Sequence, residues 1–228
     1  MVELEWDRSF RIIHWRYPAV GIFDRIVDPA DLDAIVALEA RINDRIRDEL
    51  GEIALVRPSD RIAGPGATPI MAAFTLIRPG RFSDGTFGVY YAAHVLDTAI
   101  AETIYHTESF YRASHEPSAD IDMRVYAARI SGAFEDLRSV TIASDARLDP
   151  DSYLESQRFA AGLYEANECD GIVFPSVRDA THRDCVACLR PKSISAAHPD
   201  RYLTYRWNGV ERKITVVFHR EALSGPEA

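Results

Sequence analysis

The sequence predicts an α+β fold in a single domain, with a mixed or antiparallel sheet of several short strands and two to three main helices. Short apolar runs alternate along the chain with stretches of helical period, and no repeat or low-complexity tract interrupts them. The 228 residues, 47% of them hydrophobic, suffice for one substantial core. We therefore expect residues 1–228 to form one domain.

The first third of the chain is dominated by one amphipathic stretch. Apolar residues recur at steps of three and four from Asp31 to Leu50, and Gly51 follows where a helix C-cap belongs. This pattern predicts a helical insertion at about residues 28–52. The other elements expected here are a strand at 9–15, a short strand at 53–56, a loop at 58–69 and a strand at 70–77.

The rest of the chain predicts strands that alternate with two helices. Asp97 is a plausible N-cap for the first helix. Asn208-Gly209 indicates a hairpin over 201–219 with a type I′ turn, in which both central residues need positive φ. The remaining expected elements are strands at 88–93, 122–130 (on a half-buried sheet), 171–175 and 184–189, and a helix at 153–166.

Charge and composition exclude several functional classes. The net charge of −9 argues against direct nucleic-acid binding, which needs a basic surface. The acidic N-terminus lacks the basic and apolar regions of a signal peptide, and no apolar run approaches the roughly 20 residues of a membrane span. The three cysteines are too sparse for a disulfide framework. We expect a cytoplasmic protein without membrane contact.

One group of polar residues combines charges suited to chemistry. Arg78 and Arg81 lie in a Gly-rich loop, Tyr91 is in the next predicted strand, and Glu102 is in the helix that follows. A carboxylate inside a short apolar helix is disfavoured unless it has a partner or a task. Ser176 follows the apolar strand at 171–175, at a strand end where a site is often lined.

These residues resemble the motif of the RES domain, a family named for its Arg, Glu and Ser. The spacings are those of the family, because Arg81 and Tyr91 are ten residues apart and Tyr91 and Glu102 eleven. The resemblance covers roughly residues 64–191. The matching segments are Gly80-Arg81-Phe82-Ser83, with Phe-Ser in place of the common Trp-Asn, then Tyr91-Ala92, Glu102 and Pro175-Ser176.

The resemblance implies an ADP-ribosyltransferase-like fold and an NAD-consuming toxin of a bacterial toxin–antitoxin pair. The long segment before the motif is similar to that of the ParT branch, which implies transfer of ADP-ribose to a protein, with phosphoribosyl pyrophosphate synthetase as the candidate acceptor. It also implies a cognate Xre-like antitoxin with a helix-turn-helix DNA-binding part. An NAD glycohydrolase or phosphorylase would use the same site, and the sequence does not separate these reactions.

The roles of the two charged motif residues follow from the chemistry of NAD. Cleavage of the nicotinamide–ribose bond develops oxocarbenium character, which the carboxylate of Glu102 would stabilise. Arg81 offers bidentate hydrogen bonds to the pyrophosphate, and Arg78 could strengthen that site.

The remaining candidates carry roles that the resemblance implies. Tyr91 would stack on nicotinamide or bond the ribose, whereas Tyr90 points to the opposite face and is expected in the core. Ser176 would hold the ribose or the carboxamide. Arg16 is the candidate for an N-terminal arginine near NAD, in competition with Arg11, Arg25 and Arg61.

Two alternatives belong to other functional classes. The first is a zinc module built from Cys169, His182, Cys185 and Cys188; we disfavour it because residues three apart on a strand point to opposite faces, and we expect no metal. The second is a non-catalytic protein-binding module that keeps the fold. The retained Arg81 and Glu102 argue against it.

Overall fold

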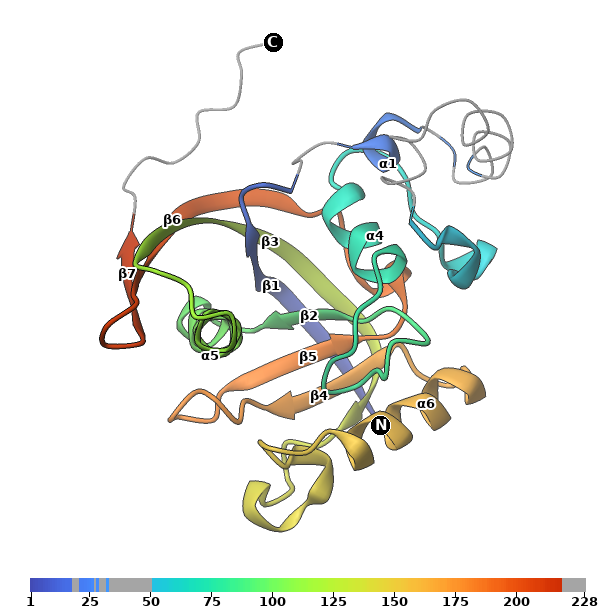
Figure 1. The fold of residues 1–228 in the computed structure, drawn as a ribbon. Helices are drawn as coiled ribbons and strands as arrows, with labels where there is room; N and C mark the ends of the chain where they lie inside the picture. The colour runs from blue at the N-terminus through green and yellow to red at the C-terminus, as the bar shows by residue number, and fades with distance from the viewer. Residues whose placement is uncertain (18–20, 27, 29–31, 33–50, 219–228) are drawn as a thin grey trace.

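A seven-stranded mixed sheet with strand order β1-β2-β5-β4-β3-β6-β7 organises the chain (Figure 1). The computed structural model describes residues 1–17, 21–26, 28, 32 and 51–218. The strands are β1 (Val2–His14), β2 (Tyr90–Ala93), β3 (Ala119–Asp136), β4 (Gly171–Pro175), β5 (Asp184–Cys188), β6 (His198–Asn208) and β7 (Lys213–Phe218). The helices are α1 (Ile22–Arg25), α4 (Thr68–Thr75), α5 (Leu96–Ala113) and α6 (Leu154–Ala166), with 3-10 turns at Ile53–Leu55, Pro58–Asp60, Ile142–Ser144, Ala146–Leu148 and Pro191–Ser193. No helix in these described ranges is long and apolar enough to cross a bilayer.

The pairing of β1 closes part of the sheet into a ring. This strand pairs with β3 along its length, from Val2 opposite Phe134 to His14 opposite Met123. It also meets β2, but the single register position recorded between them is Phe10 opposite Ala93. Five strands therefore form a closed ring, in the order β1, β3, β4, β5 and β2. Between β1 and β2 very little backbone pairing closes this ring.

A hydrophobic cluster covers each face of the central strands of the sheet. Tyr90 belongs to the cluster that contains Ile70 and Phe74 of α4. Tyr91 packs against the cluster that contains Ile100 of α5 and Ala160 of α6. Figure 1 shows α4 and α5 on opposite sides of β1 and β2. Burial on both faces explains the nearly continuous apolar runs of β2, β4 and β5.

The predicted α+β class with a mixed sheet is confirmed, and so are the strands predicted near 88–93, 122–130, 171–175 and 184–189 and the helix near 153–166. The predicted short strands are present as β2, β4, β5 and β7, beside the longer β1, β3 and β6 of 13, 18 and 11 residues. One expectation about the sheet is wrong. Strand β3 is not half-buried, since Arg124 and Tyr126, which the alternating pattern placed on its outward face, are 5% and 1% exposed.

Two predicted strands are helical. Residues 70–77 fall largely in α4, and residues 53–56 form a 3-10 turn. A short apolar run fits a strand and a buried helix equally well, and here Pro69 stands at the helix start, where its missing N–H costs nothing. Of the predicted insertion at 28–52, residues 29–31 and 33–50 lie outside the described residues.

The predicted N-cap of α5 and the predicted turn type of the hairpin are also wrong. Val95, not Asp97, is the N-cap of α5; Asp97 lies in the first helical turn, 3.6 Å from the guanidinium of Arg183. The predicted hairpin is confirmed, but its turn is not type I′, because Asn208 pairs with Lys213 across a four-residue loop. Positive φ occurs at Arg212, whose N–H donates to the Asn208 carbonyl at 2.7 Å.

Gly88 sets how closely α4 approaches β2, and its replacement tests that packing. A Cβ atom there would lie 2.2 Å from Cα of Phe74, so we expect Gly88→Ala to lower the free energy of unfolding by about 1–3 kcal/mol. Gly162→Ala is the matched control. Gly162 lies inside α6, where an added Cβ would meet no atom within 4 Å outside its chain neighbours and the backbone of its own helix, so the change should stabilise by about 0.5–1 kcal/mol. Urea denaturation measures both; equal effects would contradict the tight α4–β2 contact.

Candidate active site

A cavity of about 930 Å³ opens where β1 and β2 separate. Residues of both strands line it, together with α4, α5 and the loop that precedes β2. Its volume lies near the upper end of the range of about 300–1,000 Å³ for small-molecule sites, as a dinucleotide would require. The charged side chains that line it in the described part of the chain are three arginines and one carboxylate: Arg11, Arg78, Arg81 and Glu102. An acidic protein thus has a locally positive cavity.

Glu102 is held in place by Ser176. The Ser176 hydroxyl donates to Oε1 of Glu102 at 2.5 Å and accepts the N–H groups of Arg178 and Asp179 at 3.1 and 2.9 Å. A serine hydroxyl has one proton and two lone pairs, so all of its hydrogen-bonding capacity is used. With loop N–H groups on its acceptor positions, it directs its proton at Glu102. The other carboxylate oxygen has no recorded partner within the described chain and remains for a ligand.

Asp179 fixes the loop that presents Ser176. This side chain is 7% exposed and accepts hydrogen bonds from the Thr98 hydroxyl of α5 at 2.6 Å and from Nε of Arg183 at 2.8 Å. Burial acts to raise the pKa of Asp179, but the hydrogen bonds from Arg183, Thr98 and Thr181 outweigh it and hold that pKa well below its ordinary value. The loop after β4 is thereby tied to the start of the helix that carries Glu102.

Arg81 is buried in the wall of the cavity. Its Nη1 donates to the carbonyl of Asp149 at 2.8 Å, and its guanidinium lies 4.7 Å from the ring centre of Tyr153. Burial lowers the pKa of Arg81, and the nearby Tyr153 and Glu102 offset part of that change. A guanidinium carries five N–H donors, so most of them stay available for an anion.

Tyr91 supports the loop that carries Arg81. Its hydroxyl accepts the N–H of Phe82 at 2.8 Å, and burial raises its pKa above the ordinary value. Gln157 of α6 donates to the carbonyl oxygens of Gly80 and Ser83 at 2.9 and 3.2 Å. The position of Arg81 is thus set by side chains from β2 and α6.

Arg11 occupies the place where β1 and β2 diverge. Its Nη1 donates to the carbonyl of Tyr91 at 3.1 Å, and its guanidinium lies 4.7 Å from the ring centre of Tyr90. Its Nε is buried without a hydrogen-bond partner among the described residues, and burial lowers the pKa of Arg11. A guanidinium with a vacant donor and no carboxylate partner in the described chain is suited to bind an anionic ligand.

The cavity also contains His106, which the sequence reasoning did not select. His106 and Glu102 are four residues apart on α5, so both lie on one helix face, and both line the cavity. One part of the ring meets solvent and the rest is desolvated by the protein. Burial lowers the pKa of His106, Glu102 raises it in part, and Arg178 and Arg81 lower it. The lowered pKa favours the neutral form of the imidazole, which can accept a proton. The four-residue spacing from Glu102 was the signal that could have identified it.

A family model for the RES domain matches residues 58–208. The chain belongs to the RES domain family. It is also 25% identical over 215 residues to the uncharacterized protein y4oC of Sinorhizobium fredii, an alignment that covers 93% of this chain and 88% of that protein. Membership in the RES family indicates, in general terms, an NAD-utilising enzyme of the toxin–antitoxin kind. The mixed sheet with its flanking helices is consistent with the ADP-ribosyltransferase-like fold that the resemblance implied.

The residues of the RES motif come together, although not all in the same way. Arg78, Arg81, Tyr91 and Glu102 line the cavity, whereas Ser176 is fully buried behind Glu102 and contacts the cavity through that carboxylate. Tyr90 is fully buried in the core on the other face of β2.

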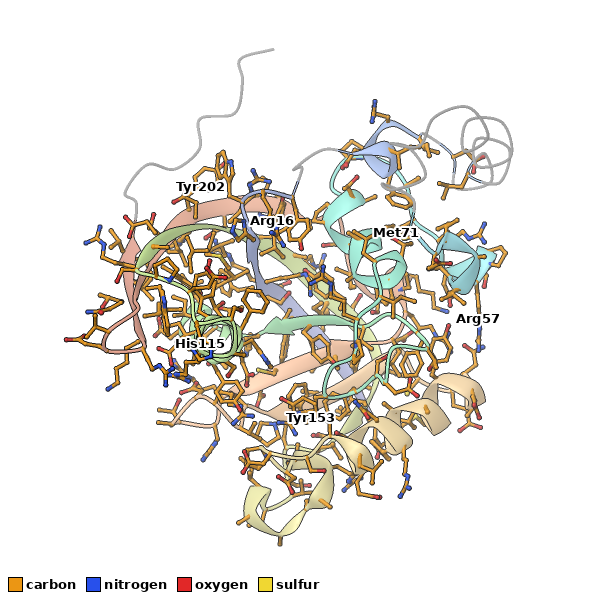
Figure 2. The ribbon with its side chains drawn as sticks, in the orientation of Figure 1. Arg16, Arg57, Met71, His115, Tyr153 and Tyr202 are labelled. Carbon is orange, nitrogen blue, oxygen red and sulfur yellow. The ribbon has the colours of Figure 1, made fainter. Side chains whose placement is uncertain are left out.

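Of the candidates for an N-terminal arginine, Arg11, Arg16 and Arg25 lie outside the matched RES segment, and Arg61 lies inside it but does not line the cavity. Arg16, the candidate from the sequence, is exposed and does not line the cavity; its Nη2 donates to the hydroxyl of Tyr17 at 3.3 Å. Arg11 from the same strand lines the cavity instead. Figure 2 shows Arg16 just past the end of β1, well apart from Tyr153, whose ring centre lies 4.7 Å from the Arg81 guanidinium.

The three cysteines of this RES domain do not form a common cluster. Cys185 and Cys188 lie in the two separate core clusters on opposite faces of β5, and Cys169 is buried outside both clusters. No group of three or more potential metal ligands occurs in the part of the chain that the structure describes.

The acid dependence of stability tests the role of Asp179. Because its folded pKa is depressed, Asp179 stabilises the protein above the unfolded pKa of about 4, and this contribution is lost as the pH falls through the folded value. Asp179→Asn should cost about 1–3 kcal/mol at pH 7, and the difference from the wild type should shrink below about pH 4. Asp97→Asn, an exposed partner of the same Arg183, is the control and should change stability little. Denaturation curves between pH 7 and pH 3 measure this; a difference independent of pH would contradict it.

Proposed function

We propose that this RES domain is the toxin of a bacterial toxin–antitoxin pair, which cleaves the nicotinamide–ribose bond of NAD and transfers ADP-ribose to a protein. The observation that carries the proposal is one dinucleotide-sized cavity in which the Glu102 carboxylate, fixed by Ser176 at 2.5 Å, shares the wall with the guanidiniums of Arg11 and Arg81. Those groups match the developing cation and the anionic pyrophosphate of NAD.

The proposed reaction needs a carboxylate at the breaking bond. As the C–N bond breaks, its electron pair leaves with nicotinamide, whose ring nitrogen becomes neutral, and positive charge develops on the ribose. The free oxygen of Glu102 would stabilise that charge directly or through a ribose hydroxyl. Because Ser176 prevents rotation of the carboxylate, little reorganisation is needed when the charge appears.

Two guanidiniums suit the pyrophosphate. Arg81 and Arg11 flank Tyr91, one near its ring and one at its carbonyl oxygen. Each could hydrogen-bond one phosphate, and planar guanidiniums do so bidentately. The dinucleotide would then lie along the opening between β1 and β2.

The acceptor completes the reaction by forming a bond to the anomeric carbon and giving up a proton. His106 lies one helical turn from Glu102 toward solvent and could take that proton while neutral. Its solvent contact also favours a second candidate function, in which water or phosphate is the acceptor and the enzyme is an NAD glycohydrolase or phosphorylase.

The proposal includes a partner. With a net charge of −9, the chain would depend on an Xre-like antitoxin with a helix-turn-helix part for any DNA contact. Copurification of the two chains, followed by loss of NAD turnover in the complex, would support this part of the proposal.

Replacement of the carboxylate tests the catalytic role. Glu102→Gln keeps the shape and an acceptor for Ser176 but removes the charge, so we expect at least an ~100-fold loss of nicotinamide release with a normal fold. Glu165→Gln, an exposed change on α6, is the matched control and should turn over NAD like the wild type. Near-normal turnover by Glu102→Gln would remove Glu102 from the reaction.

The acceptor is identified with NAD labelled in its adenylate half. Purified chain, free of antitoxin, is incubated in buffer, with phosphate, and with cell extract. Label on one protein band supports the transferase; soluble labelled ADP-ribose supports the hydrolase, and a phosphate requirement supports the phosphorylase. Absence of nicotinamide release under all three conditions contradicts the enzyme proposal and favours a binding module.

A further inference from the structure

The cavity holds more positive charge than NAD requires. The pyrophosphate of NAD carries one negative charge on each phosphate, and its nicotinamide ring carries one positive charge. Arg11 and Arg81 are sufficient for the two phosphates, and Glu102 faces the cationic end. Arg78, a third lining arginine, has no role in that arrangement.

Arg78 lies at the rim beside a second arginine. It follows the end of α4, and with Tyr17, which follows β1, it lines the cavity. Arg16 donates to the Tyr17 hydroxyl at 3.3 Å, and its guanidinium lies 5.2 Å from the centre of that ring. The hydrogen bond from Arg16 lowers the pKa of Tyr17 below its ordinary value, and Arg78 lowers it further. The Arg16 guanidinium thus contacts the Tyr17 hydroxyl, and Arg78 lines the same cavity close enough to influence the pKa of that hydroxyl.

No carboxylate among the described residues pairs with Arg16 or Arg78. Two exposed arginines elsewhere provide a contrast, since Arg158 and Arg206 form ion pairs with Glu155 and Asp120 at 2.8 and 3.1 Å. Two neighbouring unneutralised cations repel each other unless an anion joins them. The rim therefore offers a ready site for a group with a double negative charge.

The place of this rim in the cavity indicates which part of the ligand would reach it. Figure 2 shows Arg16 well apart from Tyr153, which contacts Arg81. The nicotinamide ribose belongs beside Glu102, and the pyrophosphate between Arg81 and Arg11. The second nucleoside then lies toward the ends of β1 and α4, among apolar residues, with its ribose near the rim. Those apolar residues are Ile13, Ile22, Ala73 and Leu76.

We propose that Arg16, Tyr17 and Arg78 bind a phosphomonoester on the adenosine ribose, so that the chain binds NADP in preference to NAD. A phosphomonoester carries a charge of about −1.5 to −2 at pH 7 and offers three acceptor oxygens, which matches two guanidiniums and one hydroxyl. The assignment of this end to the adenosine rests on the proposed NAD-cleaving function.

Calorimetric titration with two unreactive fragments tests the proposal. ADP-ribose and 2′-phospho-ADP-ribose differ by the one phosphate and need no catalysis. The wild type should bind the phosphorylated fragment about tenfold more tightly, on the scale of one charge-assisted hydrogen bond. The double variant Arg16→Ala/Arg78→Ala should bring the ratio of the two affinities close to one. Tyr17→Phe should reduce it by a smaller factor.

The matched control removes the same charge elsewhere. Arg158→Ala/Arg206→Ala replaces two exposed arginines away from the cavity and should keep the tenfold ratio. Equal affinities in the wild type, or an equal loss of the ratio in the control, would overturn the proposal. In the second case, the loss of net positive charge, and not the loss of these two side chains, would explain the change in the ratio.

Two further outcomes separate this proposal from the others. If neither NAD nor NADP releases nicotinamide but the ratio behaves as expected, the NAD-cleaving function fails and the phosphate site stands. If inorganic phosphate stimulates NAD cleavage in the wild type and not in the double variant, the rim binds a free phosphate acceptor, and the assignment to the ribose phosphate is overturned.

Discussion

The separation of β1 from β2 is the constraint on which the site depends. These strands close a ring of five, yet the register between them is the single pair Phe10 and Ala93. Arg11 donates to the carbonyl of Tyr91 where the ladder would otherwise continue. The backbone oxygen is thereby satisfied while the strands remain apart, and the cavity follows from that arrangement.

The proposed chemistry depends on a second arrangement, in which a serine acts through a glutamate. Ser176 does not reach the cavity, but its hydroxyl is saturated by two loop N–H groups and by Glu102. The resemblance implied that Ser176 would contact the substrate; in the proposed reaction its hydrogen bonds make it a positioning residue instead. Asp179 extends the same support by tying the loop to Thr98 on the helix of Glu102. The carboxylate is therefore fixed before substrate arrives.

The sequence was sufficient to predict the parts of the site that residue spacing determines. The interval between Arg81, Tyr91 and Glu102 predicted a loop, a strand and a helix that meet at one place, and they do. The sequence was insufficient to predict features that depend on tertiary contacts. An apolar run such as α4 has no period long enough to distinguish a helix from a strand. Likewise, Arg11 and Arg16 belong to one N-terminal segment, and only the position of β2 decides which of them enters the cavity.

A crystal structure of the Glu102→Gln variant with NAD bound would test the central claim most directly. The account predicts the anomeric carbon of the nicotinamide ribose beside the side chain of residue 102, with Ser176 still bonded to it, and the pyrophosphate in contact with Arg11 and Arg81. NAD bound outside the opening between β1 and β2, or a pyrophosphate that neither arginine contacts, would contradict it.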